Sequence, residues 1–188
     1  MHRAFAIAVS IVLSMSAAQA ASPLSSEQVT HFVETLAPIQ TFGDALEKEG
    51  KLNVLIGGGA SANGEFKPYS TGVDALKKQF PADFRRLAGV VKPHGFTPEE
   101  WGETGDRVMA AYMALRIERD EPGALDRIEP VDLEELKKMP PELQIQMRDY
   151  MAMMEAVKKA PSADRTAVLP SMELIDAHIA AQEEAGGK

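Results

Sequence analysis

Apolar side chains recur at helical spacing in the central part of the chain, residues 84–115. A first segment places its apolar residues on one helix face and ends at Pro93, which has no N–H to donate within a helix. A second, longer segment carries an apolar seam whose members are four, three, four and three residues apart: Trp101, Gly105, Val108, Tyr112 and Leu115. This spacing places all five on one stripe of a helix. Because Gly105 has no side chain, we expect another helix to cross closely there.

The residues between the two segments have the pattern of a helix end followed by a helix start. Gly95 can adopt the left-handed conformation that is common after a helix. Thr97 and Glu100 form a predicted capping box, with Pro98 at the first helical position. Further along the same helix, Glu103 and Arg107 have the favourable four-residue spacing of a solvent-exposed ion pair.

Shorter patterns predict the helices on either side of this region. Ser25 and Gln28 form a second capping box, which begins a helix that is either kinked or split at Pro38. Ser70 or Thr71 is expected to cap the helix that precedes the central segment.

The C-terminal third of the chain contains the same apolar spacing as the central helix. A helix over residues 141–159 carries a second seam with the same spacing, after which Ser162 is expected to cap a last helix that kinks or restarts at Pro170. Residues 182–188 form a polar tail that we expect to fray. The second seam consists of Leu143, Met147, Tyr150, Met154 and Val157.

These patterns predict an all-α fold, a single-domain helical bundle of about five to seven helices with several of them kinked at proline. We expect both seams to meet in one core. Its predicted members are Trp101, Val108, Tyr112, Leu115, Leu87, Val91, Met147, Tyr150 and Met154.

The N-terminus has the features of an export signal. Arg3 supplies positive charge, residues 4–17 are mainly apolar, and Ala18-Gln19-Ala20 matches a signal-peptidase site. We therefore expect residues 1–20 to be a signal peptide that is cleaved after Ala20, leaving residues 21–188 as one helical domain in a bacterial periplasm. Because no second long apolar run follows, we expect no membrane insertion after cleavage.

Composition narrows the classes of function. The chain has no cysteine, which excludes disulfides, thiolate metal sites and thiol catalysis. Its formal net charge is −8, which aids solubility and disfavours nucleic acid as a partner. No sequence feature indicates a cofactor. A glycine run at residues 57–59 lacks the following Gly-Lys-Ser/Thr of a phosphate-binding loop, and Glu65 stands where the lysine would be needed.

Methionine is the residue type that most suggests chemistry. Met147, Met151 and Met154 lie three or four residues apart on the helix predicted over residues 141–159. Thioethers are soft ligands for Cu(I), so the three are candidate metal ligands. Methionine is also an adaptable filler of helical cores, and a methionine-lined groove can bind apolar partners.

The other candidate groups give weaker signals. His31 and His178 lie off the main seams, and His94 lies in the predicted turn, so solvated or capping roles are expected for all three. Carboxylates are frequent at helix starts, where capping and solvation account for them. The motifs of serine hydrolases, penicillin-binding enzymes and zinc proteases are absent from the sequence, so catalytic activity is not indicated.

Residues 94–115 read HGFTPEEWGETGDRVMAAYMAL. This stretch resembles small exported all-helical proteins of proteobacteria, and the resemblance implies a helical fold without an established activity. We therefore expect a non-enzymatic binding or accessory module that meets a protein partner in the cell envelope. Two alternatives stay open: a Cu(I)-binding protein, and a small-molecule carrier or enzyme with a pocket between helices. A cavity lined by both apolar and convergent polar groups would favour the pocket.

Overall fold

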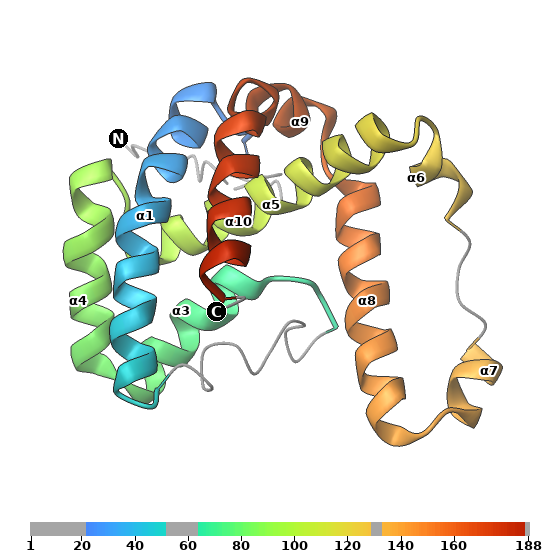
Figure 1. Cartoon of the computed structure of the whole chain (residues 1–188), viewed down its shortest axis with the longest axis horizontal. Helices are drawn as coiled ribbons and strands as arrows, with labels where there is room; N and C mark the ends of the chain where they lie inside the picture. The colour runs from blue at the N-terminus through green and yellow to red at the C-terminus, as the bar shows by residue number, and fades with distance from the viewer. Residues whose placement is uncertain (1–21, 52–63, 129–132, 187–188) are drawn as a thin grey trace, which may run out of the picture.

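The computed structural model describes residues 22–51, 64–128 and 133–186 (Figure 1). Within these ranges the chain is all-helical, and Phe66 makes a single isolated β-bridge. The predicted fold class is confirmed, with more helical segments than the five to seven expected because short connections such as α6 and α7 are also helical. The elements are α1 (Ser26–Lys48), α3 (Pro68–Gln79), α4 (Pro81–Val91), η1 (Lys92–His94), α5 (Pro98–Asp120), α6 (Ala124–Arg127), α7 (Leu133–Lys138), α8 (Pro141–Lys159), α9 (Ser162–Val168), η2 (Leu169–Ser171) and α10 (Met172–Gly186).

Helix α5 is the centre of the fold and contacts α1, α3, α4, α6, α8 and α9 (Figure 1). The predicted seam is confirmed, since Trp101, Val108 and Tyr112 are all buried in one apolar core. Residues on other faces of α5 are buried too, including Gly102 and Ala111. Such all-round burial is typical of a central helix rather than of a surface helix with one apolar stripe.

The predicted close crossing at Gly105 is also confirmed. A Cβ atom at this position would lie 2.7 Å from Cγ of Tyr69 on α3 and 2.9 Å from Cε2 of Phe32 on α1. The two rings and the Trp101 indole form one cluster, with ring centroids 5.3 to 5.8 Å apart. The indole Nε1 donates to Oγ1 of Thr35 at 2.8 Å, so the N–H of the buried indole is satisfied.

Both predicted capping boxes are present, at Ser25 and at Thr97. Helix α4 ends before Pro93, and Gly95 adopts the left-handed conformation with φ of 84°. Helix α1 continues through Pro38 without a break, so it is not split. Most of the other prolines begin helices rather than kink them, which fits proline at a first helical position.

Helix α3 begins earlier than expected, at Pro68, and neither Ser70 nor Thr71 caps it. Its first amides are instead capped by a side chain from α5. The N–H of Tyr69 donates to Oδ1 of Asp106 at 2.8 Å, and the N–H of Ser70 lies 3.3 Å from Oδ2. Burial raises the pKa of Asp106, while these hydrogen bonds lower it. A cap from a distant helix cannot be recognised from local sequence.

The C-terminal helices also differ in detail from the expectation. Ser162 is the first residue of α9, where it makes no side-chain cap hydrogen bond. The predicted restart at Pro170 is confirmed, because η2 separates α9 from α10. Helix α10 continues through the first part of the polar tail to Gly186, so fraying of this tail stays a prediction.

The expected core position of the second seam is wrong for part of α8. In its C-terminal half Val157 lies in the core and Met154 is buried outside it, whereas Tyr150 is 50% exposed and Leu143 is 44% exposed. Met147 is only half-buried and does not belong to the core. The reason is that α8 runs away from α5, with α7 beside its N-terminal end (Figure 1). We call residues 133–159 the arm.

The export signal expected at residues 1–20 and the glycine run at residues 57–59 lie outside the described residues. Across the described ranges, every helix is too short or too polar to span a bilayer.

Candidate functional site

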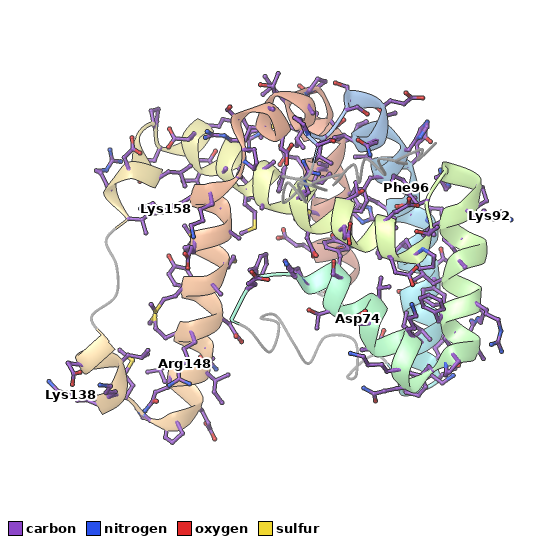
Figure 2. The ribbon with its side chains drawn as sticks, turned by 180° about the vertical axis from the view of Figure 1, so that it is seen from behind. Asp74, Lys92, Phe96, Lys138, Arg148 and Lys158 are labelled. Carbon is purple, nitrogen blue, oxygen red and sulfur yellow. The ribbon has the colours of Figure 1, made fainter. Side chains whose placement is uncertain are left out.

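A cavity of about 260 Å³ lies where the N-terminal end of α1 meets the turn between α4 and α5. We call it the α1–α5 cavity. Figure 2 labels Phe96, which forms part of its wall in that turn. Leu24 adds a second apolar group, and the other side chains around it are polar or charged. The polar and charged lining residues are Gln28, His31, His94, Glu100, Glu103, Thr104 and Arg107.

The positively charged residue that lines this cavity is Arg107, and a carboxylate on another helix holds its guanidinium in place. Its Nε and Nη2 atoms donate to the two carboxylate oxygens of Asp164 at 2.9 and 2.8 Å. Asp164 is fully buried and also accepts from the N–H of Leu24 at 2.9 Å. The expected surface pair between Glu103 and Arg107 is therefore wrong, because a buried bidentate partner outcompetes an exposed one.

Thr104 is a buried polar residue whose hydroxyl has no polar partner within residues 22–51, 64–128 and 133–186. Its side chain lines the cavity and is only 6% exposed. Thr30, Thr41 and Thr166 each donate to a carbonyl one helical turn back. Among the residues that the structure describes, the Thr104 hydroxyl makes no such bond and no other hydrogen bond. A buried hydroxyl in this state is uncommon, because its desolvation is not compensated.

Two of the histidines come together at the cavity, although the sequence predicted separate solvated or capping roles. His31 lies on α1 and His94 on η1, and both line the cavity. Nδ1 of His94 lies 3.4 Å from Oε2 of Glu34. His178 lies elsewhere, beside Gln182, and burial lowers its pKa. In the described part of the chain, no three His, Asp or Glu side chains are placed to hold a metal ion.

Two carboxylates stand at the outer edge of the cavity. Glu100 and Glu103 are exposed residues in the first turns of α5. Hydrogen bonds from the backbone N–H and the hydroxyl of Thr97 lower the pKa of Glu100. The cavity therefore combines a fixed guanidinium and a free hydroxyl inside with negative charge at its edge.

A second hollow, of about 290 Å³, has a different character. It is lined by apolar and uncharged residues of α1, α3, α4 and α5, among them Phe42, Leu46 and Leu76. Because no charged group lines it, this hollow gives no indication of the ligand that it would hold.

The arm carries the other candidate surface. Leu143, Met147 and Tyr150 continue the buried seam of α8 onto its N-terminal half, where they are exposed or half-buried. We call these three residues the arm face. Ile145, elsewhere on the same turns, is 59% exposed. Figure 2 shows Arg148 and Lys138 at this end of the arm. The arm has five basic and five acidic residues, so it is neutral within an acidic chain.

The methionine candidates for Cu(I) do not share one environment. Met154 is buried outside the contiguous core, whereas Met147 and Met151 are half-buried. Met153, which the prediction did not select, is the methionine of α8 that packs against the core. Their role as metal ligands stays a prediction.

Comparisons of this chain with protein-family models, with curated proteins and with solved structures found no similar family, protein or structure. The resemblance of residues 94–115 to small exported proteobacterial proteins therefore stays a prediction.

Proposed function

We propose that this chain is an exported, periplasmic binding module that holds a protein partner of the cell envelope on its arm face. The observation that carries the proposal is the continuity of the α8 seam. In the C-terminal half of that seam Met154 and Val157 are buried, and the N-terminal half presents Leu143, Met147 and Tyr150 to solvent. Exposed apolar groups that continue a core seam are typical of interaction sites.

The arrangement favours an amphipathic helix of the partner. The arm face spans residues i, i+4 and i+7 of a helix, which is about 10 Å along its axis. A helix that lies alongside can place its own apolar residues between these side chains. The neutral arm favours a protein over anionic lipid, because lipid-binding helices carry an excess of basic residues.

The test compares which periplasmic proteins are captured by the wild type and by two variants, each of which replaces one exposed apolar residue with serine. Tagged wild-type protein, Tyr150→Ser and Leu174→Ser are used to capture proteins from periplasmic extract, with mass spectrometry of what co-purifies. Leu174 lies on α10 and is 62% exposed, so its variant controls for loss of any exposed apolar residue. A stoichiometric partner that Leu174→Ser keeps and Tyr150→Ser loses supports the proposal. A partner retained equally by both variants, or no partner, overturns it.

A Cu(I)-binding role is the second candidate. It is favoured by the half-buried state of Met147 and Met151, which leaves thioethers near the surface of one helix face. Titration with Cu(I) under reducing conditions tests it, using Met151→Leu as a volume-conserving variant. Binding of micromolar affinity or tighter that Met151→Leu abolishes would support this role. Absence of such binding in the wild type would exclude it.

A further inference from the structure

The α1–α5 cavity is separate from the arm and shares no residue with the arm face. We propose that it binds a small zwitterion of the amino-acid class, with the carboxylate at Arg107 and Thr104 and the ammonium at Glu100 and Glu103. This inference goes beyond the proposed docking of a protein. The two can fail independently, because they use different residues and different assays.

The carboxylate position follows from two groups one helical turn apart on α5. Asp164 occupies Nε and Nη2 of Arg107, and no hydrogen bond to Nη1 occurs within the described ranges. Thr104 contributes a buried hydroxyl that has no partner there either. A carboxylate accepts hydrogen bonds from both kinds of donor, and a bond to a charged guanidinium is among the stronger ones. A bound carboxylate would therefore satisfy the hydroxyl.

The ammonium position follows from the charge at the cavity edge. A ligand that is only anionic would approach Arg107 past the carboxylates of Glu100 and Glu103, which repel it. A ligand that is only cationic would pair with these carboxylates but leave the Thr104 hydroxyl and Nη1 of Arg107 without an acceptor in the described part of the chain. A molecule that carries both charges on one α-carbon, as an amino acid does, provides a partner for each end of the cavity.

The size of the cavity selects small ligands. Its volume of about 260 Å³ lies just below the usual range for drug-sized molecules. A free amino acid with a short side chain fits this volume, and the apolar surfaces of Leu24 and Phe96 can contact its carbon atoms. The uncharged amide of Gln28 adds a further polar contact.

The experiment is a titration of the purified protein followed by amide NMR shifts. The probes are glycine, L-alanine and L-glutamine, with acetate and methylamine as ligands that carry one of the two charges. We expect the amino acids to shift amides in the turn around Phe96 and near Thr104. We expect acetate and methylamine to bind at least about tenfold more weakly. No shift with any amino acid, or equal binding of acetate and glycine, overturns the proposal.

Two variants locate the binding. Thr104→Val keeps the side-chain shape but removes the hydroxyl, and it should weaken binding by about tenfold, the factor for one hydrogen bond. Thr41→Val is the control, because Thr41 lies on the exposed part of α1 and does not line the cavity. Glu103→Gln should weaken amino-acid binding and strengthen acetate binding. Unchanged binding in Thr104→Val would assign the shifts to another site and overturn the proposal.

Discussion

Substitution of Gly105 by alanine tests the close helix crossing at the centre of the fold. The added Cβ would lie 2.7 Å from Cγ of Tyr69 and 2.9 Å from Cε2 of Phe32. Ordinary carbon contacts are about 3.5–4.0 Å, so the rings would have to move by close to 1 Å. Both rings pack against Trp101, which limits that movement.

Two opposing terms set the size of the effect. Alanine gains about 1 kcal/mol over glycine within a helix. Overpacking of a close-packed core costs about 1–3 kcal/mol, and two ring atoms in contact place this site at the upper end. We therefore expect Gly105→Ala to lower the free energy of unfolding by about 2 kcal/mol, which a domain with a stability of about 5–15 kcal/mol survives.

The matched control is Gly89→Ala in α4. Nothing lies within 4 Å of a Cβ built at Gly89, so only the helix-propensity gain applies and this variant should be more stable by up to about 1 kcal/mol. The assay is urea unfolding followed by Trp101 fluorescence and by far-UV circular dichroism. If Gly105→Ala proves as stable as Gly89→Ala, the close crossing of α1, α3 and α5 is wrong.

Three further predictions concern carboxylates. Asp164→Ala should lower the free energy of unfolding by about 3–5 kcal/mol, because it leaves the Arg107 guanidinium half-buried without its partner. A double variant with Arg107→Met should lose less than the sum in a denaturation cycle. Asp106→Ala should cost about 1–2 kcal/mol and speed hydrogen exchange of the first α3 amides, which it caps. The Arg119 guanidinium lowers the pKa of Asp176 below its ordinary 3.8. The stabilisation from Asp176 is thus present above that value and is lost as the pH falls through the lowered pKa, so Asp176→Asn should flatten the acid side of a stability-versus-pH curve.

The structural features that the sequence predicted well are determined by residues that lie within a few positions of one another along the chain. Both capping boxes, the end of α4 before Pro93 and the bounds of α8 follow from local hydrogen-bonding chemistry and from proline geometry. The Gly105 crossing was predictable too, since a glycine within an apolar helical seam indicates close backbone approach. These features need no knowledge of the tertiary fold.

The candidate site was missed because its residues meet only after folding. His31, His94 and Thr104 come from α1, η1 and α5, and no spacing in the sequence links them. The choice of partner for Arg107 went wrong for the same reason. A partner four residues away is visible in the sequence, whereas Asp164 lies on a different helix. One local signal was available: Gly102 and Gly105 lie one turn apart on the same side of α5, and α3 packs closely on both of them.

The arm shows the limit of hydrophobic periodicity most directly. The α5 and α8 seams have the same spacing, yet Val108 is buried and Tyr150, at the matching third position of the second seam, is half exposed. Hydrophobic periodicity indicates that a helix face packs against an apolar partner, but it does not indicate whether that partner belongs to the same chain. For α5 the surrounding helices supply it, and for α8 they cover only the C-terminal half. The exposed half therefore gives the most direct argument for an external protein, and Tyr150 is the residue at which that argument is best tested.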